Sequence, residues 1–226
     1  MTENDKVLEN FYNIISENKQ EMYDRIAFDR TRYITVVMEN IMKNHNASAV
    51  LRTCDCFGIQ DLHAIEKNQT YEIQRDIARG ADNWVDVHSH TKGELPSIEC
   101  LNNLKKKGYT LVSTSPHANM KINDVPLDNP IALVFGTEYK GISKEVETLS
   151  DYSVCVPMYG FTESFNISVS VALALNILRN RLENSELNWR LSFEEQVKLK
   201  IQWCTTIIRN GKNVEQEIRK RIFEKE

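Results

Sequence analysis

Apolar residues recur in short runs from about residue 30 onward, and polar, amphipathic stretches separate these runs. The runs are rich in β-branched residues, as is typical of buried strands. Strands are therefore expected at residues 33–40, 59–66, 85–89, 109–115, 131–136 and 152–157. Helices are expected at residues 44–58, 94–107 and 141–150, where the spacing is helical. This alternation predicts an α/β fold with a mostly parallel sheet and helices on both faces.

The most apolar segment begins at Asn166 and continues to Leu178, with apolar side chains on nearly every face of a predicted helix. A helix of this kind is usually buried. A polar loop joins it to the strand that ends at Pro157, and Ser164 or Asn166 can cap its first turn. A polar loop in this position suits a ligand pocket at the carboxyl edge of the sheet. An ordinary capped helix would give the same pattern.

Both ends of the chain are predicted to be helical. Residues 6–29 resemble two short amphipathic helices, with a break near residues 17–19. Near the other end, Ser192 and Glu195 form a capping box for a helix over 193–209, and Gly211 separates it from a second helix. The expected organisation is an N-terminal helical extension (1–30), a central α/β domain with the knot described below (31–183) and a C-terminal helical extension (184–226).

Composition narrows the class of protein. The 226 residues are 41% hydrophobic and 27% charged, and no run approaches the roughly 20 apolar residues of a membrane span. The five cysteines include no C-x-x-C pair, so we expect reduced thiols, a cytoplasmic setting and no metal. The net charge of −4 counts against a broad nucleic-acid-binding face, although a local basic patch remains compatible with it.

Three stretches carry candidate chemistry. Asn46 and Arg52 lie in the first predicted helix, less than two turns apart and not on one stripe. Glu138 lies between two glycines directly after a strand, where backbone can approach a ligand closely. The third stretch contains Ser164 and Asn166. Each has a structural alternative: a buried ion pair of Arg52 with Asp55 or Asp61, an ordinary loop between a strand and a helix, and a simple helix cap.

Together, these stretches resemble the three motifs of the SpoU branch of the SPOUT methyltransferases. The matching patterns are Asn46-x5-Arg52, Gly136-x-Glu138-x-x-Gly141, and Pro157-Met158 followed by Ser164-Phe-Asn166-x-Ser168. The resemblance implies a C-terminal deep trefoil knot, S-adenosylmethionine as cofactor and methyl transfer to a ribose 2′-OH of RNA. It also implies a homodimer.

The resemblance also implies residue roles. Arg52 would clamp the RNA phosphate and the developing oxyanion, and Asn46 would orient Arg52 or the ribose. Glu138 would hold Arg52 or Asn166, while Ser164 and Asn166 would shape the loop beside the methyl donor. The residues expected to receive the donor are Ser113, Thr114, Gly136, Val156, Met158 and Phe165.

The helical ends resemble those of family members that methylate guanosine 18 in the tRNA D-loop, so tRNA is the expected partner. The expected RNA contacts are Arg25, Arg30, Arg32, Arg190, Lys198 and Lys200. Three alternatives remain: methylation of ribosomal RNA or another tRNA position, a catalytically silent knotted RNA-binding subunit, and a different α/β enzyme such as an esterase. Ser164 lies in no G-x-S-x-G elbow, which disfavours the esterase.

Overall fold

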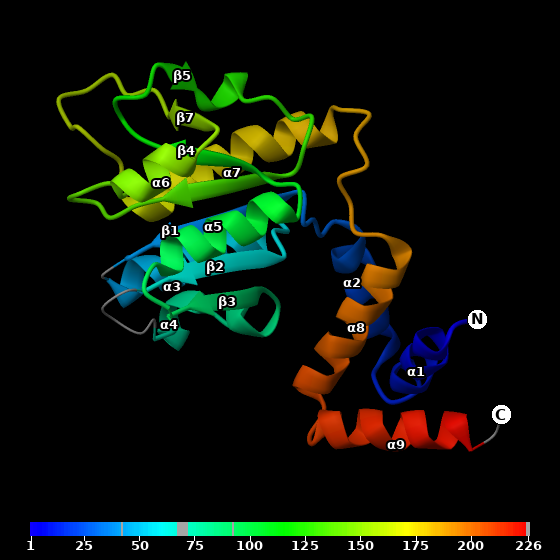
Figure 1. Cartoon of the computed structure of the whole chain (residues 1–226). Helices are drawn as coiled ribbons and strands as arrows, with labels where there is room; N and C mark the ends of the chain where they lie inside the picture. The colour runs from blue at the N-terminus through cyan, green and yellow to red at the C-terminus, as the bar shows by residue number, and fades with distance from the viewer. Residues whose placement is uncertain (42, 67–71, 92, 225–226) are drawn as a thin grey trace. The chain divides into compact units, whose positions relative to one another are not determined.

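A computed structural model describes residues 1–41, 43–66, 72–91 and 93–224. The chain forms two compact units (Figure 1). An α/β unit comprises Arg32–Trp189, and a helical unit combines Met1–Thr31 with Arg190–Glu226. Most of the two predicted helical extensions therefore belongs to one compact body, although residues 184–189 of the second extension fall in the α/β unit.

The α/β unit contains a seven-stranded sheet in the order β3-β2-β1-β6-β4-β7-β5, and every strand pairing is parallel. The strands are β1 (Ile34–Glu39), β2 (Asp61–Ile65), β3 (Asp86–His90), β4 (Thr110–Thr114), β5 (Met120–Lys121), β6 (Ile131–Phe135) and β7 (Tyr152–Cys155). Central β1 and β6 are buried along their whole length, which explains why their sequences are continuous apolar runs rather than alternating ones.

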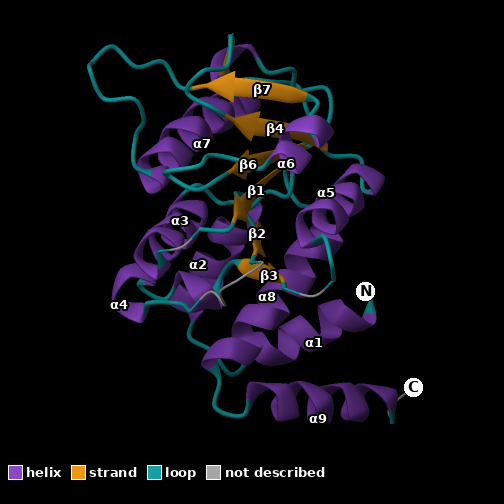
Figure 2. Cartoon of the chain, turned by 60° about the vertical axis from the view of Figure 1, so that its left-hand side comes forward, coloured by secondary structure: helices purple, strands orange, loops and turns teal. Residues whose placement is uncertain are grey.

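Helices cover both faces of this sheet, as Figure 2 shows with the sheet seen edge-on. One face carries α3 (Asn44–Cys56) and α7 (Ile167–Glu183), and the other carries α5 (Pro96–Lys106) and α6 (Lys144–Leu149). Alternate residues of β1 supply both cores, because successive side chains of a strand point to opposite faces. Val36 packs in the core with α3 and α7, whereas Val37 packs in the core with α5 and α6. The predicted α/β fold and the two helical layers are confirmed.

The helical unit contains α1 (Glu3–Tyr12), α2 (Glu17–Phe28), α8 (Phe193–Ile207) and α9 (Gly211–Phe223). The predicted capping box of Ser192 and Glu195 starts α8. Trp203 of α8 is buried, and its ring meets Tyr23 of α2 edge-on at a centroid separation of 5.3 Å. An edge-to-face aromatic pair contributes about 0.5–1.5 kcal/mol beyond its buried area, so this contact helps to join the two ends of the chain.

Several local predictions need correction. Gly211 does not separate the last two helices, because it is the first residue of α9; Asn210, with φ of 56°, makes the turn before it. Short elements also occur between the predicted strands and helices: α4 (Arg75–Ala78), η1 (Ala81–Asn83), β5 and η2 (Ile122–Asp124). Residues 67–71, which follow the strand predicted over 59–66, lie outside the described residues. Among the helices that the structure describes, none is long and apolar enough to cross a membrane.

Candidate functional site

The three sequence motifs meet at the carboxyl edge of the sheet. Asn46 lies in the first turn of α3 after β1, Glu138 lies in the loop after β6, and Asn166 precedes α7. Asn46 Nδ2 donates a hydrogen bond to Glu138 Oε1 at 2.6 Å. Asn166 Nδ2 donates to the same oxygen at 3.1 Å and to Asn46 Oδ1 at 3.3 Å. Residues far apart in sequence therefore form one polar network beside the ends of the parallel strands, where α/β proteins usually bind ligands.

Asn166 also caps a helix. Its Oδ1 accepts hydrogen bonds from the backbone N–H of Ser168 at 2.9 Å and from its hydroxyl at 2.7 Å. These bonds confirm the predicted cap and direct the opposite amide nitrogen toward Glu138. Asn46 does not cap α3, although asparagine is a common capping residue, because the capping position is Lys43 and Asn46 lies inside the helix. The Asn46 side chain is instead bonded to Glu138.

The loop from Gly136 to Gly141 is closed on itself. Thr137 and Gly141 exchange two backbone hydrogen bonds of 2.9 Å, and Gly141 has a φ of +67°. A Cβ atom at Gly136 would lie 2.1 Å from the carbonyl oxygen of Gly141, so the closed loop leaves no room for a side chain there. Glycine is required at Gly136 by close backbone approach and is favoured at Gly141 by backbone conformation.

A cavity of about 400 Å³ lies beside this loop. Five of the six residues predicted to receive the methyl donor line it, together with Ser164. They are Thr114, Gly136, Val156, Met158 and Phe165. Ser113 is fully buried and does not line the cavity; its hydroxyl donates to the carbonyl of Tyr152 at 3.3 Å. The side chain of Ser113, on the buried strand β4, points into the protein and not into the cavity.

A second cavity, of about 590 Å³, shares residues 137–142 with the first. Its wall includes Lys43 and Asn46, and Glu138 lines both cavities. Lys43 Nζ lies 3.4 Å from Glu138 Oε2, so the carboxylate faces a cation as well as two amides. Lys43 was not selected from the sequence, although its position three residues before Asn46 was a usable signal.

Arg52 is exposed on α3, whereas its neighbours Val50 and Leu51 are buried. The structural alternative of a buried ion pair for Arg52 is therefore wrong, because the helix turns this position outward. With the residues that the structure describes, Arg52 makes no hydrogen bond or ion pair. Asp61, one of its two suggested partners, binds Arg32 and His88 instead. The guanidinium is therefore available to an external anion.

The predicted RNA contacts divide into exposed and buried groups. Arg25, Arg190 and Lys198 are exposed on the helical unit. Arg30 and Lys200 were wrongly placed on the surface, since they are only 2% and 9% exposed. The Arg30 guanidinium lies 5.6 Å from the Trp203 ring centroid, and Lys200 Nζ lies 2.6 Å from Asp24. Their long stems pack in the core, as amphipathic cations often do, which leaves neither available to a phosphate.

Arg32 belongs to the α/β unit and not to the helical unit. Its guanidinium binds Asp61 and also donates to Asp86 Oδ2 at 2.9 Å. The guanidinium N–H groups that would bind a phosphate are therefore already bonded to these two carboxylates. The structure therefore explains Arg32 as an ion-pair residue linking β2 and β3, and its predicted RNA contact would require those pairs to break.

An all-parallel α/β sheet with the three motifs gathered at its carboxyl edge is the arrangement expected of the methyltransferase class that these motifs resemble. Residues 33–176 match the SpoU rRNA Methylase family. The chain belongs to this family and is an RNA 2′-O-methyltransferase.

Individual relatives agree with this assignment. The tRNA (guanosine(18)-2′-O)-methyltransferase of Borreliella burgdorferi is 32% identical over 202 residues, which cover 89% of this chain and 91% of that protein. The enzyme of the same name from Escherichia coli K12 is 30% identical over 159 residues, which cover 70% of this chain and 67% of that protein. The crystal structure of the A. aeolicus TrmH/SpoU tRNA modifying enzyme superposes with a TM-score of 0.75 at 26% identity, covering 85% of this chain and 98% of that one.

Proposed function

We propose that this chain transfers a methyl group from S-adenosylmethionine to the ribose 2′-OH of guanosine 18 in tRNA. The observation that carries the proposal is the network of Asn46, Glu138 and Asn166 between two cavities at the carboxyl edge of the sheet. The tRNA substrate is supported by the relatives from Borreliella burgdorferi and Escherichia coli, whose names specify that reaction.

The cavity of about 400 Å³ fits the methyl donor in size and chemistry. Small-molecule sites usually measure about 300–1,000 Å³ and combine apolar walls with a few polar groups. Here Val156, Met158 and Phe165 offer apolar surface, and Thr114 and Ser164 offer hydroxyl groups. S-adenosylmethionine would supply a sulfonium methyl group, which needs no metal to activate it.

The chain's own residues must make the ribose hydroxyl reactive. A 2′-OH is a weak nucleophile at neutral pH, so its developing negative charge needs stabilisation. Exposed Arg52 can bind both an RNA phosphate and the oxyanion through its planar set of donors. Arginine is a permanent cation in proteins and therefore a poor simple base, so a neighbouring RNA phosphate would accept the proton of the hydroxyl.

Glu138 positions this machinery. Its Oε1 accepts from two amides and its Oε2 faces Lys43, so the carboxylate holds α3 and the start of α7 against the loop that follows β6. Asn46 is thereby fixed less than two turns from Arg52 on the same helix. Preorganisation of this kind lets an exposed arginine meet substrate without the network rearranging.

The working unit of this proposal is a knotted homodimer. The family resemblance supports a trefoil knot formed from the segments around residues 131–183. The N-terminal part of α7 supports a partner, because Val169 is 43% exposed and Phe165 before it is 38% exposed in a single copy. Residues 31–183 would carry the reaction in the cytoplasm, and the helical segments 1–30 and 184–226 would bind tRNA.

The decisive experiment measures methyl transfer from labelled donor to three tRNA transcripts. One contains guanosine 18, one contains 2′-deoxyguanosine at that position, and one contains adenosine. We expect label on the first only, mapped to nucleotide 18, with transfer unchanged by a metal chelator. Transfer to ribosomal RNA fragments or to another tRNA position would overturn the proposed substrate. Tight donor and tRNA binding without transfer would indicate a silent subunit.

A further inference from the structure

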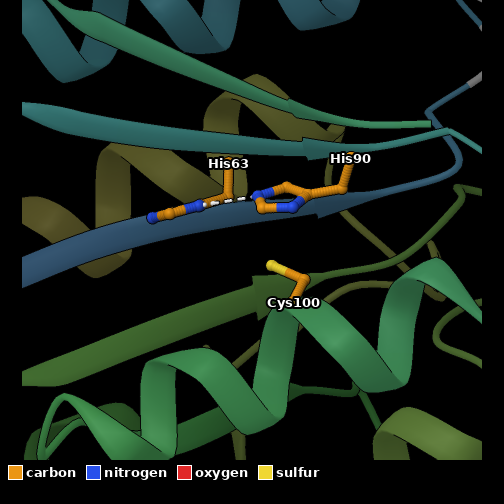
Figure 3. A group of neighbouring side chains, drawn as sticks. All are labelled: His63, His90 and Cys100. Atoms are coloured by element: carbon orange, nitrogen blue, oxygen red, sulfur yellow. Dashed lines mark hydrogen bonds between the residues drawn. The ribbon is translucent and has the colours of Figure 1, made fainter. Parts of the chain in front are cut away.

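Two histidines and a cysteine converge in a part of the α/β unit that the proposed methyl transfer does not use. His63 comes from β2, His90 from β3 and Cys100 from α5 (Figure 3). One potential ligand atom from each lies within 4.8 Å of the others, and His63 Nδ1 is 3.0 Å from His90 Nε2. None of these residues lines either cavity around Glu138.

The fold explains this convergence. Strands β2 and β3 are parallel neighbours, with His63 opposite His88 and Ile65 opposite His90. Side chains two residues apart share a face, so all three imidazoles lie on the side that α5 covers. The His63 ring stacks on His88 at 4.7 Å and on His90 at 5.2 Å. Cys100 points from α5 into the same core, where Leu101 and Leu104 pack.

We propose that His63, His90 and Cys100 bind a Zn²⁺-class metal ion, with water as the fourth ligand. Two nitrogens and a sulfur form a donor set that zinc prefers. Zinc–nitrogen bonds of about 2.0–2.1 Å in a tetrahedral site place two ligand nitrogens about 3.3 Å apart. The present nitrogen separation of 3.0 Å is close to this value, so the main adjustment is an inward rotation of the thiol.

The protonation states favour ligation by the histidines. Burial, reinforced by neighbouring His88, lowers the pKa of His63 to about 3, which favours the neutral imidazole. One of the two facing nitrogens of His63 and His90 donates to the other, so that ring must move its proton to its second nitrogen before both nitrogens can bind the ion. Burial raises the pKa of the Cys100 thiol to about 12, so the metal must displace a proton. That proton leaves to solvent, and the sulfur binds as thiolate. The positive charge of Lys107 helps the thiolate to form, although it repels the ion itself.

A route for the ion and space for the water ligand are both present. A cavity of about 350 Å³ adjoins the cluster and is lined by His63, His90 and Cys100, together with His88, Asn103, Leu104, Lys106 and Lys107. The carboxylate of Asp61 binds His88, which stacks on His63, so negative charge also lies near the site. A bound ion would link strand β3, at the end of the sheet, to β2 and α5, and would therefore stabilise the fold rather than act in methyl transfer.

Cobalt provides the direct test, because Co²⁺ occupies zinc sites and shows a thiolate-to-metal absorption band when sulfur is a ligand. The full-length metal-free protein is titrated with Co²⁺, and bound Zn²⁺ is then counted after dialysis. We expect one ion per chain and a thiolate band. Zn²⁺ at about 100 times its dissociation constant should lower the unfolding constant about 100-fold.

Three variants locate the ligands. Cys100→Ser should abolish the thiolate band, and His90→Gln should weaken binding at least about tenfold while leaving methyl transfer unchanged. Exposed Cys56 on α3 is the matched control, so Cys56→Ser should retain the band. If Cys100→Ser fails to fold, two other measurements replace it. The first is metal binding by His90→Gln, at a half-buried position, and the second is protection of Cys100 from alkylation by Zn²⁺ in the unmodified protein. Absence of binding in the folded parent, or a band that survives in Cys100→Ser, would overturn the proposal and leave a hydrogen-bonded histidine pair.

Discussion

The buried carboxylate of Glu39 binds Ser143 twice, accepting from its backbone N–H at 2.8 Å and from its hydroxyl at 2.7 Å. It also accepts from the Ser97 hydroxyl at 2.8 Å. Ser143 caps α6 and follows directly after the loop that lines both site cavities. Glu39 lies at the end of β1, so the central strand anchors the loop, and Glu39 itself also lines the cavity of about 590 Å³.

Replacement of Glu39 should therefore loosen the loop. Hydrogen bonds to charged groups contribute about 1.5–3 kcal/mol, so we expect Glu39→Gln to lower the free energy of unfolding by about 2 kcal/mol. Donor affinity, measured by calorimetry, should fall more than the turnover of donor-saturated enzyme. Glu145→Gln, an exposed substitution on the same helix α6, is the control and should change neither quantity. An unchanged donor affinity in a folded Glu39→Gln protein would remove Glu39 from this role.

Asn166 allows its two roles to be separated. Asn166→Asp keeps the oxygen that caps α7 but places a second carboxylate beside Glu138, whereas Asn166→Ala removes both functions. We expect Asn166→Asp to lower turnover at least about tenfold, because it replaces a donor by a like charge. Asn166→Ala should add a stability loss of about 1 kcal/mol from the missing cap. Thermal unfolding and single-turnover rates measure the two effects, and equal turnover in Asn166→Asp and the parent would contradict the network's importance.

Arg52 should matter for chemistry and not for folding. Because the described structure gives it no internal partner, Arg52→Ala should leave the unfolding midpoint and donor affinity nearly unchanged. Turnover should fall about 10²-fold or more, the scale of one lost preorganised donor. Arg52→Lys should not restore it, since a point charge lacks the planar fork. Arg75→Ala, at an exposed arginine on α4, serves as the charge control; a comparable loss there would point to general RNA attraction.

Gly136 offers a steric test of the donor cavity. An alanine there meets the Gly141 backbone at 2.1 Å, and overpacking typically costs about 1–3 kcal/mol. We expect Gly136→Ala to weaken S-adenosylmethionine binding at least about tenfold. Gly160 has open space around its Cβ position and ordinary backbone angles, so Gly160→Ala should bind the donor normally. Equal affinities in the two variants would place the donor elsewhere.

The proposed tRNA binding by the helical unit is best tested with charge-reversing substitutions rather than with a deletion. Removal of residues 186–226 would strip α1 and α2 of the helices that bury Phe11 and Tyr23, so the remaining protein would be unstable for structural reasons. We instead expect Arg25→Glu and Lys198→Glu to weaken tRNA binding and to leave donor binding intact.

Salt dependence separates phosphate contacts from indirect effects. Each lost contact should reduce the slope of log affinity against log salt by about 0.7–0.9. Lys200→Met is the internal control: it removes the ion pair that the buried Lys200 makes with the exposed Asp24, so it should lower stability without changing that slope. Parent-like slopes for both exposed variants would exclude this surface from RNA binding.

The sequence predicted the features that depend on local pattern. The apolar runs located the six longer strands, and Asn166 was recognised as a cap because caps follow local rules. The local sequence pattern could not predict that the two helical ends pack together. Arg30 and Lys200 were therefore expected on the surface, although tertiary contacts bury them. The separation of His63 and His90 by 27 residues likewise hides a cluster that only strand pairing creates.

The site shows the same division. Motif spacing identified Asn46, Glu138 and Asn166, but their mutual hydrogen bonds depend on how three loops meet at the sheet edge. Alternation along β4 turns Ser113 inward while leaving Thr114 at the cavity, a choice of face that a short apolar run does not specify. Glu39 was not predicted because an acidic residue at the end of a strand is usually exposed to solvent, and nothing in the local sequence shows that this one is buried.

The helical unit cannot complete its packing until synthesis is almost finished, because α1 and α2 are translated long before α8 and α9. About 165 residues separate the end of α2 from the start of α8. At about 5–20 residues per second, the nascent α1–α2 segment waits on the order of ten to thirty seconds for its partners. During that interval Phe11 and Tyr23 lack their covering helices while the α/β unit is already emerging. The growing chain therefore presents a temporary apolar surface on α1 and α2, which stays uncovered until α8 and α9 have been synthesised.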